Sequence, residues 1–109
     1  MKNKIVALAA AILSWSAMAQ TGYSQDSGQI AEVFASQTGA IAIRLSNGYK
    51  NGIAAGQCPG GDGTWAGLTA PNSSIKAAIM LAKAQNSTVV ITTSGCEGGW
   101  LKIMDMYVK

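Results

Sequence analysis

A helix followed directly by a strand, framed by the chain's two cysteines, is the feature of this sequence that most restricts its fold. Within residues 71–93, apolar side chains recur at the helical spacing i, i+3, i+4 and i+7: Ile75, Ala78, Ile79 and Ala82. Residues 72–74 supply short side-chain oxygens that can cap the first free N–H groups, and Asn86 is the expected left-handed cap at the other end. The β-branched run 89–91 then favours extended backbone. These signals predict one amphipathic helix that leads straight into a strand.

The two cysteines, Cys58 and Cys96, allow a single intramolecular disulfide. Such a bond closes the chain around the helix and the strand, which is worth on the order of 3–4 kcal/mol in the loop-entropy model. Two free thiols are the alternative. A zinc site is disfavoured, because the chain has no histidine and two cysteines do not fill four coordination positions. We therefore expect a structural disulfide and no metal.

The first nineteen residues have the three parts of an export signal. Lys2 and Lys4 form a positive start, residues 5–13 are an unbroken apolar run, and residues 17–19 read A-M-A, a cleavage site of the A-x-A type. The apolar run is shorter than the ~20 residues that a membrane-spanning helix needs, so we expect no membrane insertion. A buried N-terminal helix is the alternative. The pattern predicts a secreted or periplasmic protein, cleaved after Ala19, with residues 20–109 as one domain.

Charge and composition exclude several classes of function. Without Lys2 and Lys4, the eight basic residues fall to six against five acidic ones, a net charge of +1 that gives no reason to expect nucleic-acid binding. A serine or cysteine nucleophile needs a base beside it, and the chain has no histidine. The few carboxylates fall mostly on predicted loops. We therefore expect no catalytic residues and no cofactor.

The expected elements are mostly strands, with residues 20–27 as a frayed polar start. Strands are predicted at residues 28–36, 40–45, somewhere within 49–58, 88–93 and 100–108. Apolar residues change side within the first strand, which indicates a bulge, a strong bend or a strand buried on both faces. In the last strand, alternation places Leu101, Ile103 and Tyr107 on one face. The order β-β-β-α-β-β predicts a mainly β (α+β) protein, a five-stranded OB-fold-like barrel with one disulfide.

The opening strands carry S-G-x-I-x-x-V-F from Ser27 to Phe34 and T-G-x-I at residues 38–41. A later run places Cys58, Trp65, a helix, V-x-I at residues 89–91 and Cys96 in that order. This order resembles the OB-fold B subunits of subtilase-cytotoxin and typhoid-toxin type AB5 toxins. It resembles still more a wider set of small secreted bacterial proteins. The resemblance implies an OB-fold and a structural disulfide. For the toxin branch it implies a ring of five subunits that binds sialylated glycans through a first-strand serine, whose position here is Ser27.

Sugar binding requires an aromatic platform surrounded by polar groups. Tyr23 and Tyr49, on predicted loops, are the aromatic candidates for surface recognition. Trp65 and Trp100 stand near the cysteines, so we expect them to be mainly core residues. Arg44 points away from the apolar face of its strand, where it either pairs with an acidic sugar or simply faces solvent.

Together these observations predict a secreted, non-enzymatic binding protein, in its sharpest form a glycan-binding module like a toxin B subunit. The tentative ligand-binding residues are Ser27, Tyr23, Tyr49 and Arg44. The alternative is a periplasmic structural or inhibitory module that docks on another exported protein. The expected partners are a glycan or such a protein. A homo-oligomer, namely a pentamer, is expected in the toxin-like case, and a monomer is expected for the wider set of secreted proteins.

Overall fold

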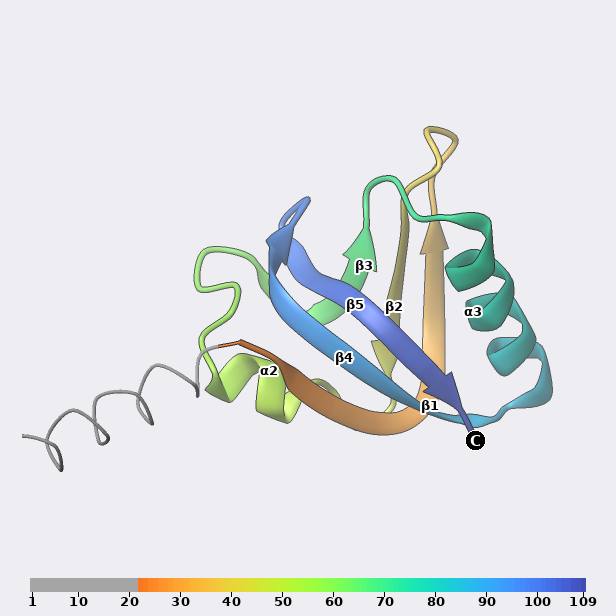
Figure 1. Cartoon of the computed structure of the whole chain (residues 1–109), viewed down its shortest axis with the longest axis horizontal. Coiled ribbons are helices and arrows are strands. Elements are labelled where there is room, and N and C mark those ends of the chain that lie inside the picture. The colour runs from red at the N-terminus through yellow and green to blue at the C-terminus, as the bar shows by residue number, and fades with distance from the viewer. Residues whose placement is uncertain (1–21) are drawn as a thin grey trace, which may run out of the picture.

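A computed structural model describes residues 22–109, so the predicted signal peptide lies outside the described residues. The elements in this part of the chain are β1 (Ser24–Ala35), β2 (Ile41–Leu45), α2 (Lys50–Ala54), β3 (Asp62–Leu68), α3 (Ser73–Gln85), β4 (Thr88–Glu97) and β5 (Trp100–Val108) (Figure 1). No helix between residues 22 and 109 is long and apolar enough to cross a membrane.

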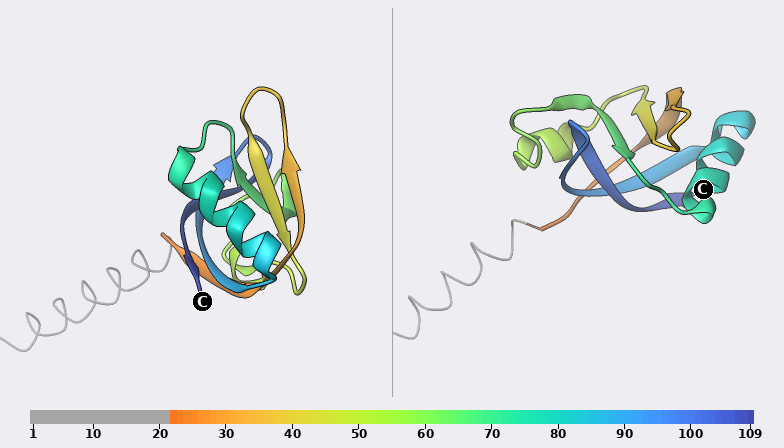
Figure 2. Two further views of the ribbon diagram at one scale, coloured as in Figure 1. Left: turned by 90° about the vertical axis from the view of Figure 1, so that its right-hand side faces the viewer. Right: turned by 90° about the horizontal axis from the view of Figure 1, so that it is seen from above.

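The strands close a barrel in the order β1-β2-β3-β5-β4, and β1 pairs with both β2 and β4. β3 and β5 run parallel, whereas the other neighbouring pairs are antiparallel. The long helix α3 connects β3 to β4, and α2 lies on the opposite side of the barrel (Figures 1 and 2). The predicted five-stranded OB-fold-like barrel is therefore confirmed.

The first strand is longer than predicted, because it pairs with two neighbouring strands. Residues 24–29 pair with β4 and residues 30–35 pair with β2, so the predicted frayed start is wrong over Ser24–Ser27. Hydrogen bonds to β4 hold this polar segment, and its own sequence does not show them. Ile30 pairs with Leu45 and Glu32 with Arg44, which leaves Ala31 as an extra residue in β1. This is the predicted bulge.

A second bulge changes the alternation of β5. Ile103 pairs with Thr93 and Asp105 with Thr92, so β5 advances two residues while β4 advances one. The side chains beyond this point therefore exchange faces. Leu101 and Ile103 are buried as predicted, but Tyr107 is exposed and Met106 packs against the core instead. The prediction that Tyr107 shares the inner face is wrong.

The predicted third strand within residues 49–58 is also wrong. This segment forms the short helix α2 and a loop, and the third strand is β3. Two N–H groups at the start of α2, from Asn51 and Gly52, donate to the carboxylate of Asp26 on β1 at 2.9 and 3.1 Å. Gly52 also sits so close to the Leu101 side chain that a Cβ atom there would lie 3.0 Å from it. The helix therefore forms through contacts with distant parts of the chain.

Helix α3 follows its sequence signals closely. The Asn72 side chain accepts a hydrogen bond from the Ile75 N–H at 2.9 Å, and Asn86 ends the helix with φ 57°, in the left-handed region. Ile79 and Ala82 are fully buried in the core, while Met80 on the opposite face is exposed. Both caps and the buried face of the helix are confirmed.

The disulfide between Cys58 and Cys96 is formed, with the two Cα atoms 4.8 Å apart. It joins the loop after α2 to β4, close to the turn that leads into β5. The predicted pairing is confirmed, and the bond closes the part of the chain that contains β3 and α3.

Candidate functional site

An open hollow lies on the outer face of the barrel, across β1, β2, β3 and β5. Its volume is about 280 Å³, and its lining consists of Phe34, Ala42, Asp62, Trp65 and Trp100. We call it the aromatic hollow. Three of its five side chains are aromatic, one is a methyl group and one is a carboxylate. Ligand sites commonly combine an apolar, aromatic lining with a few placed polar groups in this way.

Strand pairing brings these residues together. Phe34 on β1 pairs with Ala42 on β2, and Asp62 on β3 pairs with Trp100 on β5. Trp65 adjoins Ala66, which is fully buried in the barrel core, so alternation turns Trp65 outward. The site therefore depends on four strands and on the parallel pairing of β3 with β5.

The floor of the hollow is Ala42, the smallest of the lining residues. Ala42 stands between two core residues, Ile41 and Ile43, so its methyl group faces outward. It is nevertheless fully buried. Its partner on β3 is Gly67, where an added Cβ atom would lie 2.8 Å from the Ala42 Cβ atom and closer still to the Ile41 carbonyl oxygen. A larger residue at either position would fill the floor or push the strands apart.

The walls are partly exposed aromatic rings. The Phe34 and Trp100 rings meet edge to face, with centroids 5.8 Å apart and planes at 65°. This arrangement is the one that aromatic pairs prefer, and it favours the observed orientation of the two rings. Phe34 is 44% exposed, and both tryptophans are half-buried. Apolar ring surface therefore remains available to a ligand.

Asp62 supplies the carboxylate at the rim. Its Oδ1 atom accepts hydrogen bonds from the Thr64 N–H at 3.0 Å and from the Thr64 hydroxyl at 2.6 Å. These bonds, the hydroxyl one first, lower the pKa of the Asp62 carboxyl below its ordinary value. The backbone N–H of Asp62 donates to the Gly99 carbonyl at 2.8 Å, which ties it to the turn before Trp100. The carboxylate is thus ionised and held in place.

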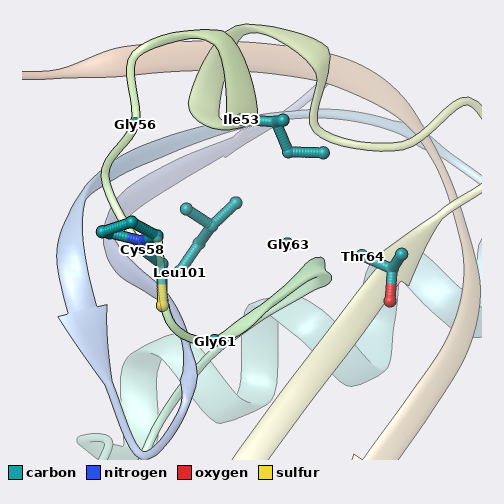
Figure 3. A pocket seen from close by; sticks show the side chains of 8 residues that line it. Ile53, Gly56, Cys58, Gly61, Gly63, Thr64 and Leu101 are labelled. Atoms are coloured by element: carbon teal, nitrogen blue, oxygen red, sulfur yellow. The ribbon is translucent and has the colours of Figure 1, made fainter.

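A second hollow, of about 270 Å³, opens beside the disulfide (Figure 3). Its lining is Ile53, Gly56, Cys58, Pro59, Gly61, Gly63, Thr64 and Leu101. The side chains of Ile53 and Leu101 reach into it (Figure 3). The hydroxyl of Thr64 already donates a hydrogen bond to Asp62. This second hollow offers apolar contact but few groups that would orient a ligand, so the aromatic hollow is the stronger candidate.

Of the predicted site residues, Tyr49 is placed most differently from the expectation. It is fully buried in the core, and its hydroxyl donates to the Ile43 carbonyl at 2.9 Å. Burial, together with the nearby Asp26 carboxylate, raises the pKa of Tyr49 far above its ordinary value. The expectation that Tyr49 is an exposed loop residue available to a ligand is wrong. Its buried contacts come from strands that its local sequence does not reveal.

The other three predicted residues lie on the surface but not around either hollow. Tyr23 is 67% exposed just before β1. Ser27 is exposed on β1, where its carbonyl accepts a hydrogen bond from the Asn47 side chain at 2.8 Å. Arg44 forms an ion pair with Glu32 on the neighbouring strand. The structure therefore does not gather the predicted residues into one site.

Sequence reasoning misses the two tryptophans of the aromatic hollow. Trp65 and Trp100 were assigned mainly to the core, yet both line the open face. For Trp100 the signal was present, because Leu101 and Ile103 were already assigned to the inner face and alternation turns Trp100 outward. For Trp65 no such signal exists, because the third strand is predicted within residues 49–58 and Trp65 lies outside that range.

No protein-family model, no curated protein and no solved structure matches this chain. The resemblance to toxin B subunits therefore stays a prediction, and the function must be argued from the site itself.

Proposed function

We propose that this protein is an exported, non-enzymatic carbohydrate-binding protein and that the aromatic hollow is its sugar site. The observation that carries the proposal is the set of three partly exposed rings around the small floor residue Ala42, with one fixed carboxylate at the rim. The apolar faces of sugar rings can pack on such aromatic walls, while a carboxylate accepts hydrogen bonds from sugar hydroxyls.

The position of the hollow on the barrel supports the same proposal by analogy of fold. OB-fold barrels bind oligosaccharides and oligonucleotides across the face of their second and third strands. Here the lining includes Ala42 on β2 and Trp65 on β3, and Trp100 stands directly after the β4–β5 turn. An oligonucleotide is disfavoured, because the rim carries an ionised carboxylate and phosphates require a basic surface.

A glycan array and titration calorimetry with residues 20–109 test this proposal. We expect binding to at least one glycan class, and Trp65→Ala or Trp100→Ala should weaken it by about tenfold or more, because each removes one wall. Tyr107→Ala is the matched control, since it removes an exposed aromatic ring outside the hollow. Silence on all glycans, whether sialylated, neutral or amine-bearing, would overturn the proposal, as would equal losses in the control.

The second candidate is a structural or inhibitory module that docks on another exported protein. It is favoured by exposed apolar side chains away from the hollow: Met80 and Leu81 on α3, and Met104, Tyr107 and Val108 on β5. Co-purification of the native protein separates the two proposals, because docking requires a stoichiometric partner. Light scattering on the same sample tests the toxin-like assembly, for which about five chain masses are expected.

A further inference from the structure

We infer that the aromatic hollow selects glycans that carry a free, protonated amino group, with Asp62 as the counter-charge. This inference rests on the proposed sugar-binding function of the hollow and names its ligand class. The negative charge of Asp62 and the aromatic rings of the walls both favour such a ligand.

Among residues 22–109, the carboxylate of Asp62 has one oxygen atom without a hydrogen-bond donor and no ion-pair partner. Both of its side-chain hydrogen bonds fall on Oδ1, so among residues 22–109 its Oδ2 atom has no hydrogen-bond donor. No lysine or arginine of the described chain forms an ion pair with it. The lowered pKa of Asp62 keeps the carboxylate charged at the mildly acidic pH at which sugar amines are fully protonated.

The basic side chains on the neighbouring strand positions are already paired. Arg44, two residues beyond Ala42 on β2, is bound to Glu32. Lys102, two residues beyond Trp100 on β5, lies 3.7 Å from a carboxylate oxygen of Glu97. Among the five residues that line the hollow, Asp62 is the only charged one. An acidic sugar would meet an uncompensated negative charge, whereas an ammonium group would meet a partner.

The walls favour the same ligand. An ammonium group is attracted to the face of an aromatic ring, and tryptophan gives the strongest such attraction. Trp100 is the strand partner of Asp62, so a ring and a carboxylate border the same part of the hollow. A protonated amine there can contact the ring and the carboxylate together, while the remaining sugar surface packs against Phe34 and Trp65.

Titration calorimetry with two matched oligosaccharides tests the inference. Glucosamine oligomers carry the free amine, and N-acetylglucosamine oligomers of the same length carry it capped and neutral. At mildly acidic pH and low salt, we expect the amine form to bind about tenfold more tightly. The preference should shrink as salt is added, because the site is open to solvent.

Two substitutions test whether the preference for the amine form depends on Asp62. Asp62→Asn should remove it by weakening the binding of the amine form about tenfold more than the binding of the acetylated form, because only the amine loses a charge partner. Asp105→Asn is the matched control, since it also removes one exposed negative charge but lies outside the hollow. The melting temperature of each variant verifies that it is folded.

The outcomes separate the two proposals. Equal affinity for both oligomers, or tighter binding of acetylated or sialylated glycans, overturns the amine preference and leaves the sugar-binding function standing. An equal effect of Asp62→Asn and Asp105→Asn overturns the role of Asp62, because it shows a general charge effect. If no glycan of any kind binds, the proposed function itself fails and the inference fails with it.

Discussion

Replacing Asp26 with alanine should destabilise this protein more than any other removal of a single charge. Asp26 is only 7% exposed on β1, and its two carboxylate oxygens accept the N–H groups of Asn51 and Gly52 at 2.9 and 3.1 Å. Helix α2 has no side-chain cap of its own at Tyr49, so Asp26 supplies the cap from a distant strand. Asp26→Ala therefore leaves two N–H groups without their acceptor.

The magnitude follows from the two bonds. A hydrogen bond to a charged group is worth about 1.5–3 kcal/mol, and a lost helix cap costs about 1 kcal/mol. Part of this is recovered, because Asp26 itself no longer has to be desolvated. We expect Asp26→Ala to lower the free energy of unfolding by about 2–4 kcal/mol, out of a typical total of about 5–15 kcal/mol. Asp26→Asn keeps one acceptor oxygen and should cost about half as much.

Urea denaturation followed by tryptophan fluorescence measures this loss. Asp105→Ala is the control, because Asp105 is exposed on β5 and should stay within about 0.5 kcal/mol of the parent protein. A loss of less than about 0.5 kcal/mol in Asp26→Ala would refute the reasoning, since it would mean that α2 does not depend on this cap.

Three further predictions concern stability. Gly67→Ala should cost about 1–3 kcal/mol by thermal denaturation, because the added methyl group meets β2, whereas Gly60→Ala meets nothing within 4 Å and should be neutral. Replacing Cys58 and Cys96 with serine should lower the free energy of unfolding by about 3–4 kcal/mol, and an unchanged urea midpoint would contradict this. Burial raises the pKa of Tyr49, so the fold keeps a proton that the unfolded chain loses near pH 10. Stability should be complete below that pH and fall above it by up to about 1.4 kcal/mol per pH unit, and a flat profile in alkaline urea titrations would disprove the effect.

The sequence predicted α3 well because its signals are local. The Asn72 cap bonds to Ile75 within the first turn, and the Asn86 cap needs only its own left-handed backbone. In α2 the equivalent information is missing from the segment, because the carboxylate that caps it belongs to β1. Local propensity therefore predicted a strand where a distant charge holds a helix.

The aromatic hollow could not be predicted from the sequence for a related reason. Alternation assigns a side chain to a face only when the strand and its bulges are known, and here β3 was misplaced. The parallel pairing that sets Asp62 beside Trp100 joins segments separated by the whole of α3 and β4. No spacing in the sequence encodes that neighbour.

The sequence by itself determined that five strands form a barrel with a helix between the third and the fourth, the helix α3 with both caps, and the pairing of the only two cysteines. Each of these depends on residue type, on contacts within one turn, or on the absence of any alternative partner. The tertiary structure alone decided that Tyr49 is buried, that α2 exists, and that Phe34, Trp65 and Trp100 meet around one carboxylate. These features depend on strand register and on long-range hydrogen bonds, which are fixed only when the barrel closes.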